Sequence, residues 1–244
     1  MVVHPDGDAV ARATAARLLL ALLDAQGVRT PLHVALTGGT VGTKTLAEVS
    51  RSELRDLVDW SGVHLWWGDD RFVPKGDDDR NEKQARSVLL DALPIPAANV
   101  HALPASDEAA DLAAAVTVAR AELSSWASDD SLPVASPVFD VTLLGVGPDG
   151  HVASLFPGKQ SLGVIDVAAI GEPDSPKPPP ARISLTLPVL NASRQVWFVV
   201  AGADKRDAVA EVLRGGSDLP AAQVSGRDVT LWLLDAAAAG QPGV

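Results

Sequence analysis

The sequence predicts an α/β protein with a doubly wound, mostly parallel sheet and helices on both faces of that sheet. Two patterns lead to this fold class: short apolar, strand-like runs alternate with segments of helical periodicity along the 244 residues, and turns rich in glycine or proline separate several of them. The composition, with 47% hydrophobic and 21% charged residues, is that of a globular chain. Because no internal repeat and no linker interrupts the alternation, we expect one domain over residues 1–244.

The helices are predicted from apolar positions that recur three and four residues apart. The first begins near Asp8 and stops at Gly27, a residue type that commonly ends helices. The predicted helices are residues 8–26, the stretch from the TGGT turn to about residue 58, a helix that starts near residue 81, an alanine-rich helix over 107–126, and residues 204–214.

The strands are predicted from short apolar runs that lie between these helices. The predicted strands are residues 32–36, 63–67, 99–103, 139–144, 164–170, 183–187, 196–200 and 229–234. Between them, GDDRFVPKGDDDRN and the proline-rich GEPDSPKPPPA are predicted to be loops.

Charge and composition exclude several classes of function. Twenty Lys and Arg residues face 31 Asp and Glu residues, a net charge of −11, which argues against a nucleic-acid partner. The absence of cysteine excludes thiol catalysis and cysteine-based zinc sites. The first residues lack the pattern of a signal peptide and no apolar run is long enough to span a membrane, so we expect a soluble, cytoplasmic protein without a membrane partner. An anionic ligand would need a local cluster of cations.

Three loops at the carboxyl ends of predicted strands are candidate binding sites, because ligands of open parallel sheets bind there. In the first, Gly38, Gly39 and Thr40 would let the backbone approach a phosphate at a helix N-terminus. The order around Lys44 departs from the G-K-[ST] of a nucleotide-binding P-loop, so a triphosphatase is not expected. A tight strand-to-helix turn without a ligand is the alternative.

The second loop, GVGPDGH at residues 145–151, matches the spacing of a dinucleotide-binding fingerprint. Pro157 follows too soon for the helix that such a fingerprint must open, so we set this reading aside. The Pro-Asp-Gly turn instead holds His151 at a strand end. An imidazole can take up and release a proton near neutral pH, which makes His151 the leading candidate for a general base, against the alternative of a structural histidine.

The third loop carries Asp69 and Arg71, and two further cations, Arg182 and Lys205, start a strand and a helix. Arg71 is suited to bidentate bonds with a phosphate, and Asp69 to accepting bonds from sugar hydroxyls. Together the three cations would supply the local positive charge that a sugar phosphate needs, although each could instead be an ordinary surface charge. No spacing typical of a metal site or of a serine hydrolase appears, so we expect no metal and no cofactor.

The segments LTGGT, WWGDDRFVP, LLGVGPDGHVASLFPG, RISLT and VAGADK together resemble the 6-phosphogluconolactonase family, within the broader glucosamine-6-phosphate deaminase/isomerase superfamily. The resemblance extends over nearly the whole chain, and DGHVASLFPG is its most specific part. Two positions depart from the family pattern: Asp70 stands where glutamate is usual, and Arg80 precedes Asn81 where serine is common.

The resemblance implies hydrolysis of 6-phospho-D-glucono-1,5-lactone to 6-phosphogluconate, a step of the pentose phosphate pathway. His151 would be the general base and Asp149 would fix its loop or orient its imidazole. By the same resemblance, the phosphosugar site would be lined by Gly38, Gly39, Thr40, Arg71, Arg182 and Lys205, with Asp69 in a less defined role. The implied reaction needs no metal: His151 takes a proton from water, the water attacks the lactone carbonyl, and the proton passes to the ring oxygen.

Two other functions fit the same superfamily. An aminosugar-phosphate deaminase or isomerase usually carries a glutamate near the histidine, whereas here the acid-free segment SLFP follows. A non-catalytic sugar-phosphate sensor would usually carry a DNA-binding segment, and the sequence shows no basic stretch for one. We expect a small sugar-phosphate lactone as the ligand and a monomer or weak homodimer as the assembly.

Overall fold

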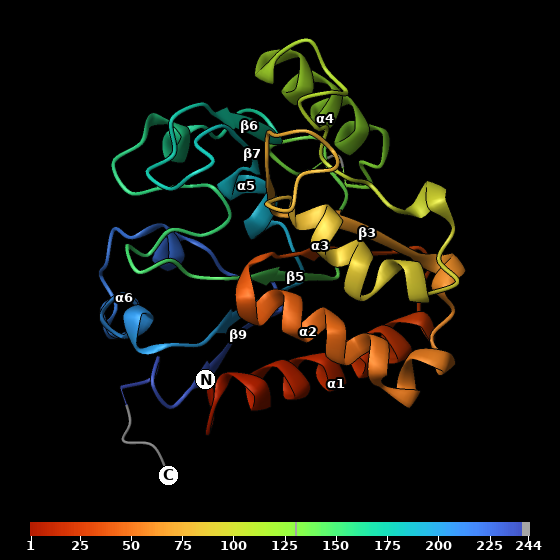
Figure 1. Cartoon of the computed structure of the whole chain (residues 1–244), viewed down its shortest axis with the longest axis vertical. Coiled ribbons are helices and arrows are strands. Elements are labelled where there is room, and N and C mark those ends of the chain that lie inside the picture. Colours follow the sequence, from red (N-terminus) through yellow and green to blue (C-terminus); the bar gives the residue numbers. More distant parts are fainter. Residues whose placement is uncertain (130, 241–244) are drawn as a thin grey trace.

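A six-stranded parallel sheet forms the centre of the protein, and helices α1 and α2 lie side by side along it (Figure 1). The computed structural model describes residues 1–129 and 131–240; position 130 and the last four residues of the predicted domain, 241–244, lie outside the described residues. The parallel sheet and the helices packed on it confirm the predicted α/β fold class.

The strands are β1 (Val2–His4), β2 (Leu32–Leu36), β3 (Val63–Trp67), β4 (Asp69–Arg71), β5 (Val141–Leu144), β6 (Ala169–Glu172), β7 (Arg182–Leu185), β8 (Gln195–Val200) and β9 (Val229–Asp235). The α-helices are α1 (Gly7–Gln26), α2 (Gly39–Arg51), α3 (Asn81–Val88), α4 (Leu112–Ser125), α5 (Leu187–Asn191) and α6 (Arg206–Arg214). The central strands are buried on both faces, which explains why their sequences are continuous apolar runs.

The order of the parallel strands, β1-β9-β8-β5-β2-β3, creates a topological switch point between β2 and β5. The chain leaves β2 toward β3 on one side, and β5 is followed in the sheet by β8 on the other, so the loops after β2 and β5 diverge above a crevice. Their first residues remain in contact, because the backbone N–H of Gly145 donates a hydrogen bond to Oγ1 of Thr37 over 3.2 Å. The ligand site is therefore expected at the carboxyl ends of these two strands.

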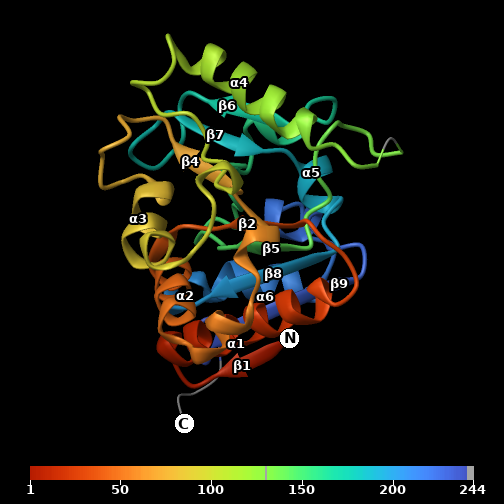
Figure 2. The ribbon, with the colours of Figure 1, turned by 90° about the vertical axis from the view of Figure 1, so that its right-hand side faces the viewer.

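A second sheet of three antiparallel strands, in the order β4-β7-β6, adjoins the parallel sheet. Figure 2 shows α4 on its outer side, away from α1. Gly68 joins the two sheets: its N–H donates to the carbonyl of Leu36 in β2 over 3.0 Å, and its carbonyl accepts from the N–H of Leu185 in β7 over 2.9 Å. This seam places the polar strand β4 directly above the carboxyl end of β3.

The predicted single sheet is wrong for this part of the chain. The 183–187 strand is β7 of the antiparallel sheet, and the polar segment predicted as a loop contains β4. The predicted 164–170 strand begins only at Ala169, because the preceding residues follow a 3₁₀ turn and Ile165 is exposed to solvent. The predicted 99–103 strand is reduced to a single bridge between Val100 and Leu65.

Two helix boundaries also differ from the prediction. The 107–126 helix begins at Leu112, because Asp111 caps it by accepting the N–H of Ala114, whereas Asp107 accepts the N–H of Lys75. The helix expected to reach residue 58 ends at Arg51, and a separate 3₁₀ turn occupies Glu53–Leu57. Within the described residues, none of the helices is both long enough and apolar enough to cross a membrane.

Three histidines, His33, His64 and His101, pack together beneath the sheet with Trp66 and Trp126. Nδ1 of His64 lies 2.8 Å from Nε2 of His101, and the indole N–H of Trp66 donates to Nδ1 of His33 over 3.1 Å. Burial lowers the pKa of all three imidazoles, and with the neighbouring histidines it lowers the pKa of His33 to about 4. The cluster is therefore built from neutral rings.

This histidine cluster should make the protein less stable in mild acid. In the unfolded chain an imidazole titrates near pH 6.5, so below that pH the unfolded state binds more protons than the native state and stability falls with pH. For His33 the loss is about 2 kcal/mol between pH 7 and pH 5. We expect urea unfolding to show a steeper decrease over this interval for the wild type than for a His33→Asn variant. Equal decreases would contradict a neutral, buried His33.

Candidate functional site

A cavity of about 440 Å³ opens at the switch point between β2 and β5. Eight of the nine predicted site residues line it, and the ninth, Asp149, bonds to one of the eight. The predicted residues that line the cavity are Gly38, Gly39, Thr40, Asp69, Arg71, His151, Arg182 and Lys205. Residues that lie far apart in the sequence are thus brought to one place.

His151 is held in the loop after β5 by its own neighbours. Nδ1 of its imidazole lies 2.5 Å from Oδ1 of Asp149, and the ring packs on Phe156 with 4.5 Å between the ring centres. The loop is closed by backbone bonds between Gly147 and His151 and between Gly150 and Gly147, both 2.9 Å long. Gly150 has a φ of +77°, a conformation that glycine adopts without strain. The turn predicted from Pro-Asp-Gly is present, and it fixes the ring at the cavity wall.

The state of Asp149 determines which nitrogen of His151 carries the proton. Burial, the largest single influence, would raise the pKa of Asp149, but the hydrogen bonds from His151, and its charge whenever the ring is protonated, outweigh burial and hold this pKa below its usual value. Asp149 is therefore a carboxylate and accepts a hydrogen bond from Nδ1–H. Nε2 of the neutral ring then has its lone pair free to accept a proton.

The N-terminus of α2 forms another wall of the cavity. Gly38 caps the helix without a side-chain bond, and the first-turn N–H groups of an α-helix have no partner within the helix. A Cβ on Gly38 would lie 1.8 Å from Oδ1 of Asn81, so only glycine allows this approach to α3. Free N–H groups and the positive end of the helix dipole make this wall suited to an anion.

Asn81, the first residue of α3, organises the polar strand β4. Its side-chain amide donates to the carbonyl of Asp69 over 2.9 Å, and its Oδ1 accepts a hydrogen bond from the guanidinium of Arg71. Oδ2 of Asp69 accepts from the hydroxyl of Ser154 over 2.6 Å. Arg71 and Asp69 are therefore fixed by hydrogen bonds to α3 and to the loop after β5.

The two departures from the family pattern, Asp70 and Arg80, face each other away from the cavity. Both are 1% exposed, and Nη2 of Arg80 lies 3.4 Å from Oδ2 of Asp70. Asp70 also accepts the backbone N–H groups of Arg71, Asn81 and Glu82, and so caps α3. Burial raises the pKa of Asp70 to about 6, against the opposing influence of Arg80 and these N–H groups. These two residues therefore do not form the cavity surface; Asp70 instead holds the backbone of Arg71 and Asn81, which do line the cavity.

Arg182 and Lys205 line the cavity from two different elements, β7 and the 3₁₀ turn Ala203–Lys205. Lys205 pairs with Asp204 over 2.7 Å at the start of the helical turn after β8. Arg182 is only 4% exposed and donates to three loop carbonyls, those of Lys177, Pro178 and Pro179, over 3.0 to 3.4 Å. Most of its hydrogen-bonding capacity thus serves to hold the proline-rich loop.

Sequence reasoning did not assign Asn81 or Lys177 to the site, yet both line the cavity. Asn81 comes after the acidic run, at the start of a predicted helix. It could not be assigned to the site from sequence, because only the packing of α2 on α3 brings it next to Gly38. Lys177 lies in the proline-rich loop directly before Arg182. A single cation in a proline-rich loop does not by itself indicate a cavity residue, because the position of Lys177 depends on hydrogen bonds from Arg182 to the loop carbonyls.

The chain is similar to proteins of known family over almost its whole length. Residues 5–232 match the family described as Glucosamine-6-phosphate isomerases/6-phosphogluconolactonase. The 6-phosphogluconolactonase of Streptomyces coelicolor is 49% identical over 99% of this chain and 94% of its own length. The 6-phosphogluconolactonase of Mycobacterium tuberculosis is 44% identical over 98% of this chain and 96% of its own length.

A solved structure of 6-phosphogluconolactonase from Trypanosoma brucei superposes with a TM-score of 0.86 at 29% identity, and the match covers 98% of this chain and 97% of that one. A monomeric glucosamine-6-phosphate deaminase shares the fold with a TM-score of 0.77 at 16% identity. The match over residues 5–232 and the two relatives above 40% identity agree. The chain belongs to the glucosamine-6-phosphate isomerase/6-phosphogluconolactonase family.

Proposed function

We propose that the protein hydrolyses 6-phospho-D-glucono-1,5-lactone to 6-phosphogluconate, with His151 as the general base and without a metal. The observation that carries this proposal is the position of His151. Its imidazole, bonded to the carboxylate of Asp149, lines the same cavity as the N-terminus of α2 and the cations Arg71 and Lys205. A proton acceptor and an anion-binding wall within one cavity suit a phosphorylated ester.

The phosphate is assigned to the wall formed by α2. Gly39 and Thr40 lie in the first turn of α2, where backbone N–H groups are suited to bind an anion, and Arg71 and Lys205 add positive charge. With the phosphate fixed at one end, the six-membered ring of the lactone extends across the cavity toward His151. Fixing the phosphate in this way holds the ester near His151, which lowers the entropic cost of bringing water and ester together.

Proton transfer follows from the tautomer of His151. Because Nδ1–H donates to Asp149, Nε2 accepts a proton from water as the water oxygen bonds to C1 of the lactone. The resulting imidazolium is stabilised by the negative charge of Asp149. When the bond between C1 and the ring oxygen breaks, the same proton passes from Nε2 to that oxygen, and the imidazole returns to its neutral form.

The test is turnover of freshly prepared lactone. We expect acid release above the spontaneous rate, measured at constant pH with a protein-free blank subtracted at each substrate concentration. Pre-incubation with EDTA should leave the rate unchanged, because every step above uses side chains and backbone groups alone. A rate that EDTA abolishes and a divalent cation restores would contradict the metal-independent part of the proposal.

The same preparation distinguishes the two alternatives. Release of ammonia from glucosamine 6-phosphate would indicate a deaminase, and binding of a phosphosugar without turnover would indicate a sensor. The deaminase is disfavoured because the residues that follow His151 in its loop, up to Pro157, include no acidic side chain beside the imidazole.

A further inference from the structure

The proline-rich loop between β6 and β7 is fixed to the protein by its backbone. The carbonyl of Lys177 accepts hydrogen bonds from the hydroxyl of Ser175 over 2.6 Å and from Nη2 of Arg182 over 3.0 Å. The N–H of Ser175 donates to the carbonyl of Pro180 over 2.9 Å, which closes the loop on itself. The position of Lys177 is therefore set without any use of its side chain.

Lys177 differs from the other cations of the cavity because its ammonium group has no partner among the described residues. Lys205 pairs with Asp204, Arg71 bonds to Asn81, and Arg182 holds loop carbonyls. Across residues 1–129 and 131–240, no hydrogen bond or ion pair involves the ammonium group of Lys177. All three of its N–H donors are available to a ligand in the cavity.

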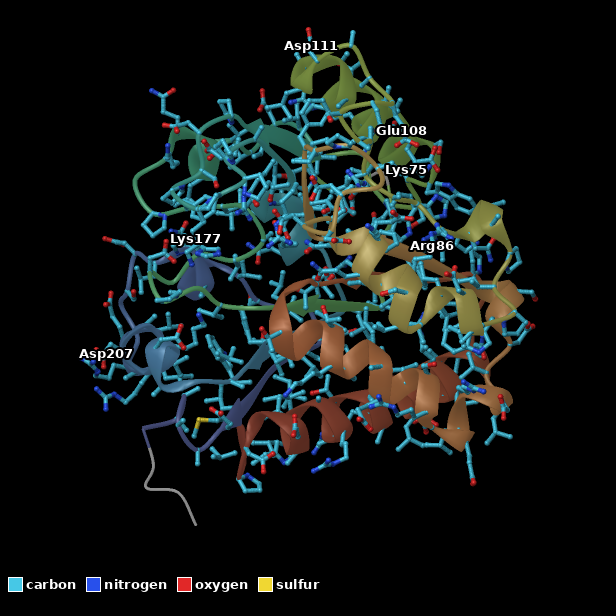
Figure 3. The ribbon with its side chains drawn as sticks, viewed as in Figure 1. Lys75, Arg86, Glu108, Asp111, Lys177 and Asp207 are labelled. Atoms are coloured by element: carbon cyan, nitrogen blue, oxygen red, sulfur yellow. The ribbon has the colours of Figure 1, made fainter. Side chains whose placement is uncertain are left out.

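Lys177 lines the same cavity as His151, and the charges of Asp149 and Lys205 both act on its ammonium group. Lys177, labelled in Figure 3, lies beside the loop that follows β5, and both line the cavity. Burial lowers the pKa of Lys177, and Lys205 and Arg182 lower it further, but Asp149 is the strongest of the surrounding charges and opposes them. The N-terminus of α2, Arg71 and Lys205 already serve the phosphate, whereas no donor has been assigned to the carbonyl of the lactone.

We propose that the ammonium group of Lys177 donates a hydrogen bond to the C1 carbonyl oxygen of the lactone and stabilises the oxyanion that forms there. The inference rests on the proposed function. As water bonds to C1 and His151 takes its proton, the π electrons of the carbonyl move onto the oxygen. Lys177 stabilises this negative charge by a hydrogen bond and does not transfer a proton to it. As C1 regains its double bond, the bond to the ring oxygen breaks and His151 returns the proton to it. In this account Lys177 is a catalytic residue, and Arg182 is the positioning residue that holds its backbone.

The proposal predicts a loss of kcat without a loss of binding when Lys177 is replaced. Removal of one oxyanion donor typically costs a factor of about 10² to 10³ in kcat. We expect this loss in Lys177→Met, with KM and the inhibition constant of glucitol 6-phosphate, which has no C1 carbonyl, within about threefold of the wild type. Lys205→Met is the matched comparison: it should raise KM and this inhibition constant, because Lys205 is assigned to the phosphate.

A Lys177→Arg variant adds a pH readout that loss of structure would not move. The guanidinium remains charged at high pH, so this variant should recover most of the lost kcat and should shift the alkaline decline of kcat to higher pH. A raised KM at unchanged kcat in Lys177→Met would assign Lys177 to the phosphate and overturn the proposal, as would unchanged kinetics. If the methionine variant fails to fold, the arginine variant decides, and an alkaline decline that does not move overturns the proposal. A wild type without turnover above the blank would instead refute the proposed function.

Discussion

Replacement of His151 by alanine is expected to remove most of the lactone hydrolysis while the fold is retained. Proton transfer by a positioned side chain contributes a factor of about 10² to 10⁴ to a rate, and His151 is the proton acceptor assigned to both steps. The side chain projects from a loop whose backbone bonds do not involve the imidazole, so its removal leaves those bonds in place. Initial rates on fresh lactone, corrected for spontaneous opening, measure the effect.

Two controls separate loss of the base from loss of structure. His4→Ala removes a histidine of β1, which lies outside the cavity, and should retain the wild-type kcat. The inhibition constant of glucitol 6-phosphate should be similar in His151→Ala and in the wild type, because the phosphate wall is unchanged. Turnover of His151→Ala within a few-fold of the wild type would rule out His151 as the general base.

Replacement of Gly147 by alanine is expected to have an effect nearly as large without altering any catalytic group. A Cβ on Gly147 would lie 2.0 Å from Nδ1 of His151 and 2.5 Å from Oδ1 of Asp149, so the imidazole and the carboxylate must both leave their present positions. Displacement of a reacting group by about 1 Å can cost a factor of about 10². We expect kcat to fall by about that factor, as measured by the same rate assay.

Gly145→Ala is the matched comparison for this substitution. Gly145 belongs to the same loop, but the nearest atom to its added Cβ would be Oγ1 of Thr37 at 3.8 Å, an ordinary contact. Its loss of kcat should therefore be much smaller than that of Gly147→Ala. Similar losses in the two variants would mean that the loop tolerates no side chain at all, and the specific clash with the imidazole would not be the cause.

The parallel sheet could be predicted from sequence because its strands are buried on both faces and read as continuous apolar runs. The antiparallel sheet could not, because β4 is the polar segment Asp69–Arg71, which resembles a loop, and its pairing with β7 joins segments more than a hundred residues apart. The backbone bonds of Gly68 that join the two sheets leave no trace in residue type. Local pattern therefore identified the element types but not their division into two sheets.

The residues of the candidate site were predicted where they follow strands. His151, Arg71 and the glycine loop lie at strand ends, and the parallel topology brings such ends together. Lys177 was not predicted, because its place depends on hydrogen bonds from Arg182 to loop carbonyls, which no local pattern encodes. Arg182 was predicted to line the site and does so, although its hydrogen bonds serve mainly the loop.

The seam at Gly68 joins two sheets that carry different parts of the site. His151 is carried by the parallel sheet, whereas Arg71 and Arg182 are carried by the antiparallel sheet. The span between the proton acceptor and these two guanidinium groups is therefore set by how the sheets dock, and the bond from Ser154 to Asp69 holds the two sheets together at the site. A substitution among the residues packed along that junction can therefore lower kcat while binding is retained. Its kinetics would then look like those of a variant that lacks a reacting group.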